Sequence, residues 1–196
     1  AVRTVRDLAW VATDQMAGGP EARPQTPSEV LFLQYTSGST STPRGVAVTH
    51  GNVIHNADLT ADHAEPVYVS WLPHFHDLAL VGCLLAAVVK GGSAHLLSPL
   101  DFMRRPALWL RMLSDKSATI SAAPNAAYEY CLRDDKIADS DLVGVDLSCL
   151  RTLANCAEPI RADTFERFAE RFGRYGLDRR VYVGGYGLAE HALCVT

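Results

Sequence analysis

The chain has 196 residues, of which 48% are hydrophobic and 20% are charged, the ordinary composition of a folded globular protein of one large domain or two small ones. Its net charge of −4 gives no general basic field for nucleic acid. No apolar run approaches the roughly 20 residues of a transmembrane helix, and the first residues resemble no signal peptide. The missing initiator Met indicates an excised piece of a longer protein.

The cysteines are odd in number, scattered, and without a Cys-x-x-Cys pair. We therefore expect them to be reduced residues of the core or of a site wall, in a cytoplasmic protein. The cysteines are Cys83, Cys131, Cys149, Cys156 and Cys194.

The first elements precede a segment rich in hydroxyl groups. Residues 1–17 have a helical pattern of apolar residues, and residues 18–29, with two Gly and three Pro, are expected to form a linker. Residues 30–35 are almost continuously apolar, which predicts a strand covered on both faces. After a loop, Thr49 is placed to cap the start of a helix.

Strands and helices alternate along the rest of the chain. Phe165, Phe168 and Phe172 mark the buried face of a helix that should end at Gly173. The predicted strands are 66–72, 93–98, 118–124, 150–156 and 181–187, and the predicted helices are 77–89, a segment from 106, 125–132, one ending at 173, and a turn from 188 onward.

This alternation predicts an α/β fold, a mostly parallel sheet with helices on both faces. Ligands of such sheets bind where loops leave the carboxyl ends of the strands. The most unusual segments, 36–45, 155–159 and 184–190, are all expected at that edge. Their convergence predicts a binding site there.

The loop after residue 36 contains five hydroxyl side chains among residues 37–42. Successive backbone N–H groups and hydroxyls form a concave array of donors that suits phosphate oxygens. Arg44 adds a fixed positive charge, and glycines allow close backbone approach. The loop is not a Walker A loop, because no Gly-Lys-Ser/Thr closes it. A solvated Ser/Thr turn is the alternative.

Six segments in order resemble the adenylate-forming superfamily of acyl-CoA synthetases, luciferases and peptide-synthetase adenylation domains, and most of all its fatty acyl-AMP ligases. The first is the string LQYTSGSTSTPRGVAVTH. The others are SWLPHFHDLALVG, LLSPLDFMRRPALWL, ATISAAPNAAYEYC, ANCAEP and GYGLAEHALCV. Residues 30–196 would then be the central part of the AMP-binding N-terminal domain.

The resemblance implies that the hydroxyl loop holds the β- and γ-phosphates of ATP. Ser41 and Arg44 stand where the superfamily commonly has Gly and Lys. Arg44 is implied to be catalytic. The implied phosphate-binding residues are Thr36, Ser37, Gly38, Ser39, Thr40, Ser41, Thr42 and Gly45.

Two later segments are implied to hold the rest of the nucleotide. Tyr186 would stack on adenine and Glu190 would bind Mg²⁺, a hard cation that prefers carboxylate oxygens. Cys156 replaces a usual Gly and would crowd the base. Glu158 and Glu190 could equally be ordinary helix-start acids. The full implied set is Asn155, Cys156, Ala157, Glu158, Tyr186, Gly187, Leu188, Ala189 and Glu190.

His76 is implied to be catalytic, at the mouth of an acyl pocket beside the reacting carboxylate. A metal cluster is a rival interpretation of His74, His76 and Asp77, but Leu78 breaks the ligand spacing. Asp77 could alternatively bind the ammonium group of an amino acid.

The implied reaction joins a fatty acid to ATP, giving acyl-AMP and pyrophosphate, and passes the acyl group to an acyl carrier protein or polyketide synthase. The family's ribose-binding Asp and C-terminal catalytic Lys would lie beyond residue 196, so we expect weak nucleotide binding and no turnover by this segment. The region 50–71 is shorter than usual. The alternatives are an acyl-CoA synthetase, an amino-acid adenylation domain, or a non-catalytic binding homologue.

Overall fold

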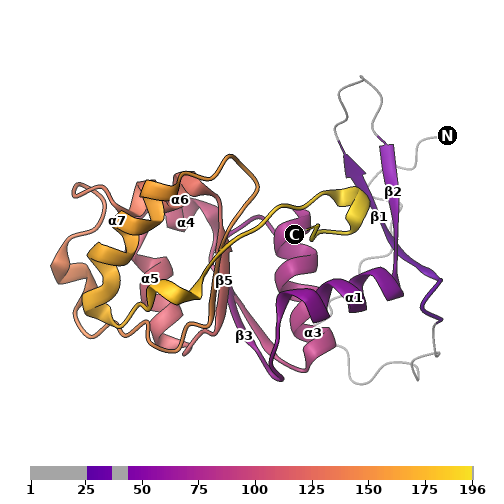
Figure 1. Ribbon diagram of the computed structural model, residues 1–196, viewed down its shortest axis with the longest axis horizontal. Coiled ribbons are helices and arrows are strands. Elements are labelled where there is room, and N and C mark those ends of the chain that lie inside the picture. The colour runs from indigo at the N-terminus through magenta and orange to yellow at the C-terminus, as the bar shows by residue number, and fades with distance from the viewer. Residues whose placement is uncertain (1–25, 37–43, 196) are drawn as a thin grey trace, which may run out of the picture.

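The computed structural model describes residues 26–36 and 44–195, and it has the α/β architecture predicted from the sequence (Figure 1). Its centre is a parallel five-stranded sheet with strand order β4-β3-β5-β6-β7. The strands are β3 Val67–Ser70, β4 Ser93–Leu96, β5 Ile120–Ala123, β6 Thr152–Asn155 and β7 Tyr182–Gly184. All five coincide with predicted strands.

One face of this sheet is covered by α1 (His50–Thr60) and by a continuous helical segment. That segment comprises α2 Asp77–Ala79, the π-helix η3 Leu80–Leu85, and α3 Ala86–Lys90. The apolar cluster beneath it includes Ala57, Tyr68, Cys83, Ala86 and Ile120. The helical segment was predicted, but its π-helical part was not.

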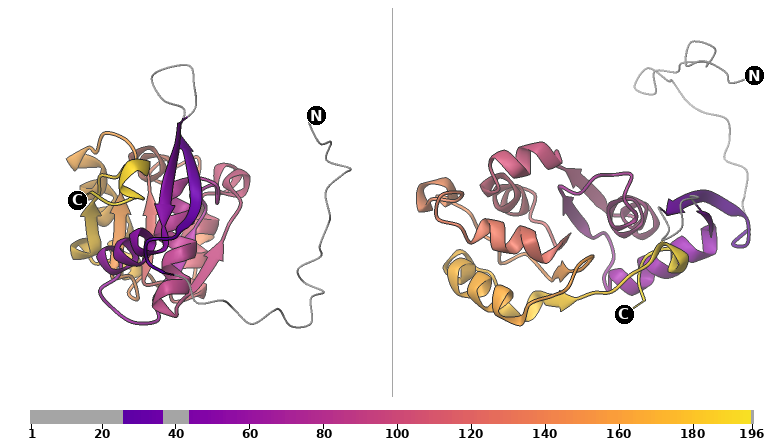
Figure 2. Two further views of the ribbon diagram at one scale, coloured as in Figure 1. Left: turned by 90° about the vertical axis from the view of Figure 1, so that its right-hand side faces the viewer. Right: turned by 90° about the horizontal axis from the view of Figure 1, so that it is seen from above.

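The opposite face carries the larger core, between the sheet and a second group of helices (Figures 1 and 2). Phe165, Phe168 and Phe172 are buried there, as their helical spacing predicted, and the helix ends before Gly173. The helices are α4 Pro99–Arg104, α5 Ala107–Asp115, α6 Asn125–Cys131 and α7 Ala162–Phe172, with short 3₁₀ turns η4 Asp139–Leu142, η5 Gly173–Tyr175, η6 Arg179–Val181 and η7 Ala189–His191. Helix α4 and these turns, apart from η7, were not predicted.

Strand β1 (Val30–Thr36) does not join the parallel sheet, contrary to the prediction of a strand buried on both faces. It pairs antiparallel with β2 (Arg44–Thr49), a strand that the sequence analysis missed. Leu33 and Tyr35 are exposed on one face, whereas Phe32 packs against Val48 and Val53 on the other. Successive side chains of a strand point to opposite faces, so a ribbon that is covered on one face leaves every second side chain exposed.

The hairpin is joined to α1 by the predicted cap at Thr49. The Thr49 hydroxyl accepts from Asn52 N at 3.2 Å, and Asn52 Oδ1 accepts from Thr49 N at 3.0 Å. This reciprocal pair satisfies backbone donors that the first helical turn leaves free.

All five cysteines are free thiols, and three of them, Cys83, Cys131 and Cys156, are buried. Cys149 is exposed, so it is not a core residue. Among the described residues, no helix has both the length and the apolar character needed to cross a membrane.

Candidate functional site

Strands β6 and β7 end side by side, and this register brings two of the unusual segments together. Asn155 is paired with Gly184, and Gly185 N donates to Asn155 O at 2.9 Å. The turn that begins at Cys156 therefore leaves the sheet beside the segment that begins at Gly185. Both lie at the carboxyl edge of the parallel strands, where the topology predicts ligand binding.

A cleft of about 380 Å³ opens at this edge. Its walls come from the end of β1, the start of α2, the turn after β6 and the segment after β7. The lining residues are Thr36, His76, Asp77, Leu78, Cys156, Ala157, Gly187, Leu188, Ala189, Glu190 and Leu193. Eight of them had been singled out from the sequence; Asp77 had been considered only for other roles, and Leu78 and Leu193 were missed.

The segment after β7 folds back on itself and so carries Glu190 to the cleft. Leu188 N donates to Leu193 O at 2.8 Å, and Val195 N donates to Tyr186 O at 2.9 Å. The turn between them is η7, which contains the exposed carboxylate of Glu190. The helical turn expected from residue 188 onward is thus present but short.

His76 caps the start of α2, so its position is fixed by the backbone. Its Nδ1 accepts from Leu78 N at 3.2 Å and lies 2.7 Å from Asp77 Oδ1. The Asp77 carboxylate also accepts from Leu78 N at 2.7 Å. The imidazole and the carboxylate thus form one partly exposed polar group on the cleft wall.

Cys156 and Ala157 line the same cleft as His76. Burial raises the pKa of the Cys156 thiol to about 11, and the nearby Asp77 and Cys194 act in the same direction. The thiol is therefore neutral at physiological pH and presents a small apolar surface. Ala157 has φ +71°, a left-handed conformation that non-glycine residues rarely adopt.

An apolar groove of about 360 Å³ adjoins the cleft and shares with it Leu78, Cys156, Gly187 and Leu193. It runs over the face of β5, β6 and β7 beside the end of α1. Its other lining residues include Leu59, Gly82, Ile120, Ala122, Ala154, Val183 and Tyr186. The site therefore places the polar side chains of the cleft, Thr36, His76, Asp77 and Glu190, beside a mainly apolar groove, which suits an amphiphilic ligand.

Some of the residues implied by the resemblance lie outside the cleft. The Asn155 side chain is fully buried and donates to Asn125 Oδ1 and to the Tyr182 hydroxyl. Glu158 lies against the start of α6 instead, and Tyr186 lines the apolar groove. Arg44 and Gly45 are exposed at the start of β2. Ser37, Gly38, Ser39, Thr40, Ser41 and Thr42 lie outside the described residues.

The exposed Glu190 carboxylate is available to a divalent cation in this cleft, whereas the Asp77 carboxylate already accepts from Leu78 N and lies beside His76. Within the described ranges, no group of three or more His, Cys, Asp or Glu side chains is arranged as a complete metal site. This donor set fits a cation such as Mg²⁺, which takes one or two protein carboxylates and completes its shell with phosphate and water.

A comparison with known protein families shows which family the chain belongs to. The model of a family described as AMP-binding enzyme matches residues 2–196. The chain belongs to the AMP-binding enzyme family. The medium-chain-fatty-acid–[acyl-carrier-protein] ligase of Moorena producens is 38% identical over an alignment of 197 positions, which covers 96% of this chain and 33% of that protein. A long-chain-fatty-acid–AMP ligase of Mycobacterium marinum is 42% identical over 90% of this chain and 31% of its own length.

Solved structures of fatty acyl-AMP ligases share the fold of this AMP-binding chain. The fatty acid AMP ligase of Legionella pneumophila superimposes with a TM-score of 0.80 at 38% identity, over 89% of this chain and 31% of that one. A fatty acyl-adenylate ligase from the same organism, in complex with acyl adenylate and pyrophosphate, gives a TM-score of 0.77 at 38% identity, over 86% of this chain and 30% of that one. The chain thus spans about a third of the length of these relatives.

Proposed function

We propose that this chain is part of an enzyme that activates a fatty acid with ATP, forming acyl-AMP and pyrophosphate, for transfer to an acyl carrier protein or polyketide synthase. One observation carries the proposal: the polar cleft and the apolar groove meet at the wall formed by Leu78, Cys156, Gly187 and Leu193. An acyl adenylate has the same division, with a polar nucleotide joined to an apolar chain. The similarity to fatty acyl-AMP ligases supports the assignment.

In the proposed reaction a carboxylate oxygen of the fatty acid bonds to the α-phosphorus of ATP, and the bond from this phosphorus to the bridging oxygen of pyrophosphate breaks. Positioning and charge neutralisation supply most of the catalysis in such transfers. Glu190 would hold Mg²⁺, which neutralises phosphate charge when it is bound. Thr36 and the loop that follows it would hold the phosphates, with Arg44 as a fixed cation.

The remaining residues are assigned by their place in the site. His76 would lie beside the reacting carboxylate, and its proximity to Asp77 would keep its ring oriented. The backbone of Cys156 and Ala157 and the segment from Gly187 to Glu190 would surround the nucleotide. Tyr186 is exposed and precedes Gly187, which the cleft and the groove share, so it would stack on adenine at this boundary. The rest of the groove, from Leu59 to Val183, would take the acyl chain.

An amino-acid substrate is the competing assignment, since Asp77 lies in the cleft. The Asp77 carboxylate is already bound to Leu78 N and lies beside His76, so it is less available for an ammonium group. The acidic residue that lines the groove is Asp62, whose side chain is paired with His63. These contacts favour an uncharged chain.

ATP–pyrophosphate exchange by the full-length protein tests the assignment. We expect exchange to depend on medium- or long-chain fatty acids and to be absent with amino acids. Exchange that responds only to amino acids would replace this proposal with amino-acid adenylation. The absence of exchange with both substrate classes would indicate a non-catalytic binding protein.

A further inference from the structure

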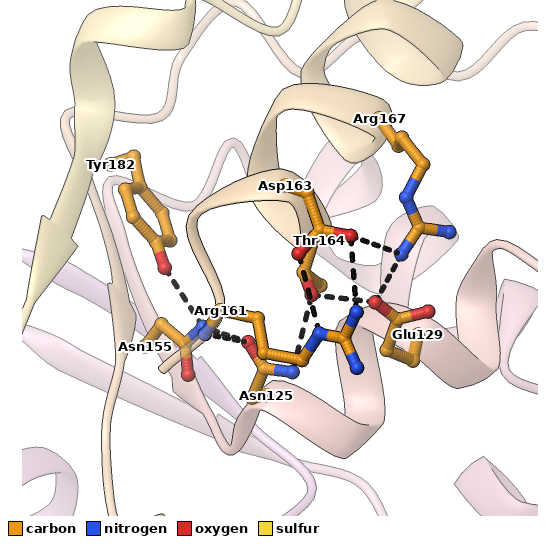
Figure 3. A network of polar contacts seen from close by, with 8 residues as sticks. All are labelled: Asn125, Glu129, Asn155, Arg161, Asp163, Thr164, Arg167 and Tyr182. Atoms are coloured by element: carbon orange, nitrogen blue, oxygen red, sulfur yellow. Dashed lines mark hydrogen bonds and ion pairs between the residues drawn. The ribbon is translucent and has the colours of Figure 1, made fainter. Parts of the chain in front are cut away.

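The last residue of β6 and the loop that leads from it to α7, together residues 155–161, are held at both ends by one side chain. Asn125, the first residue of α6, accepts two hydrogen bonds at Oδ1 (Figure 3). Asn155 Nδ2 donates at 3.0 Å from the start of the loop, and Arg161 N donates at 3.1 Å from its end. Asn125 is 5% exposed, so water competes little for these bonds.

The middle of the same loop is held by the next residue of α6. The backbone N–H of Ala126 donates to Glu158 Oε1. The start of α6 therefore contacts the loop at its beginning, middle and end. None of these contacts lies in the cleft, because Asn125, Ala126 and Glu158 line a separate surface depression beside α6.

Neighbouring contacts fix the orientation of the Asn125 amide. Its Nδ2 donates to Thr164 Oγ1 at 3.2 Å, and that hydroxyl donates to Glu129 Oε1 at 2.5 Å. Arg167 pairs with the same carboxylate (Figure 3). A rotation of the Asn125 amide would place a donor against two donors, so the network leaves one orientation.

The loop needs such support because its backbone is strained. Ala157, at φ +71°, has a Cβ that disfavours the left-handed region. Conformations of this kind persist where the surrounding structure holds them in place. Cys156 and Ala157 are also the residues of this loop that line the cleft.

We propose that Asn125 and Glu158 are positioning residues that hold Cys156 and Ala157 in place on the cleft wall. They act through the loop and do not touch the nucleotide. Glu158 thus supports the site from outside instead of contacting adenine. That this support matters for catalysis rests on the proposed function. The contacts themselves are independent of it.

Cys156 is a native reporter of the loop, since it is 8% exposed and Cys149 is an exposed reference in the same chain. We would alkylate the chain with iodoacetamide at pH 8 and measure the Cys156-to-Cys149 rate ratio by peptide mass spectrometry. Asn125→Ala should raise this ratio about tenfold, as expected when buried hydrogen bonds are lost. Glu158→Ala should raise it about fivefold, because the bond that it removes is exposed to solvent. Glu158→Gln keeps an acceptor oxygen and should stay within about twofold of the parent chain.

Tyr130→Phe is the matched control on the same helix. It removes the hydrogen bond that the Tyr130 hydroxyl donates to Met103 O at 2.7 Å, but no contact to the loop or to Asn125, so the midpoint of thermal unfolding should fall slightly while the ratio stays unchanged. A parent-like ratio in folded Glu158→Ala, or equal reactivity of Glu158→Gln and Glu158→Ala, would overturn the proposal. Glu158 is exposed, so both of its variants should fold. The comparison of Glu158→Ala with Glu158→Gln therefore tests the proposal even if Asn125→Ala fails to fold.

The labelling is done without nucleotide, so its outcome does not depend on the proposed function. A separate arm repeats it with saturating AMP, which should slow the alkylation of Cys156 if the cleft binds the nucleotide. No slowing in this arm would count against the proposed function and would leave the comparison of the Glu158 variants intact.

Discussion

The side-chain amide of Asn56 holds the backbone around Cys194 against α1. Cys194 N donates to Asn56 Oδ1 at 2.7 Å, and Asn56 Nδ2 donates to His191 O at 3.1 Å. Asn56 is 3% exposed and is 138 residues distant from Cys194 in the sequence. These two bonds fix the segment that carries Glu190, so a residue outside the cleft determines where a cleft residue lies.

Asn56→Ala should therefore loosen the Glu190 segment. It leaves a donor and an acceptor of the backbone without partners, and we expect a loss of about 1–3 kcal/mol in the free energy of unfolding. Urea denaturation measures this loss. His55→Ala, an exposed neighbour on the same helix, is the control and should change stability by less than about 0.5 kcal/mol. Equal effects of the two substitutions would contradict the role of Asn56.

Substitution of two glycines by Ala tests the segment after β7: Gly187 lies in this segment, and Gly173, after α7, is the control. A Cβ on Gly187 would lie 2.2 Å from Leu193 O, whereas a Cβ on Gly173 would meet no atom within 4 Å. Gly187→Ala should thus displace the turn and destabilise the chain by about 1–3 kcal/mol. Gly173→Ala should be neutral or stabilising by up to about 1 kcal/mol. Differential scanning calorimetry of both variants checks the order, and a harmless Gly187→Ala would show that the turn is not closed as described.

The buried thiols of Cys83 and Cys156 should lower the stability of the chain at alkaline pH. Burial raises the pKa of Cys83 to about 12 and contributes most to the raised pKa of Cys156. The unfolded chain releases these protons near pH 9, while the folded chain keeps them, so stability present below pH 9 is lost as the pH rises toward 11–12. Cys83 alone should cost about 2 kcal/mol between pH 8 and pH 10.5.

Denaturant unfolding of Cys83→Ala and of the parent chain at both pH values isolates this contribution. The cavity left by the substitution lowers stability equally at both pH values, whereas the pH-dependent loss should shrink by the share of Cys83. The same pH-dependent loss in both proteins would show that the thiol does not titrate as expected.

The sequence predicted the parallel sheet well because alternation of apolar runs with helical patterns is a local signal that the sheet topology preserves. The cap at Thr49 was equally local, since its partner Asn52 is three residues away. The prediction that residues 30–35 form a strand buried on both faces was wrong for a physical reason. An apolar run such as 30–35 fits both a fully buried strand and a ribbon with one exposed face, and sequence alone does not give the covering layer.

The contacts behind the site could not be predicted from sequence. Asn125 and Asn155 are 30 residues apart, and Asn56 and Cys194 are 138 apart. A single Asn carries no pattern that identifies its distant partner. Most of the cleft residues that were singled out lie in short, unusual segments, and His76 was singled out by the resemblance. Leu78 and Leu193 are ordinary apolar residues whose place in the cleft depends on the fold.

The central claim is that the end of β1, the start of α2, the turn after β6 and the segment after β7 form one nucleotide site. Hydrogen exchange with mass spectrometry, with and without a non-hydrolysable acyl-sulfamoyl adenosine, tests this most directly. We predict slower exchange in the peptides containing Thr36, His76, Cys156 and Glu190, and unchanged exchange in α7. Slowing that is confined to α7, or to one of these four segments, would contradict a shared site.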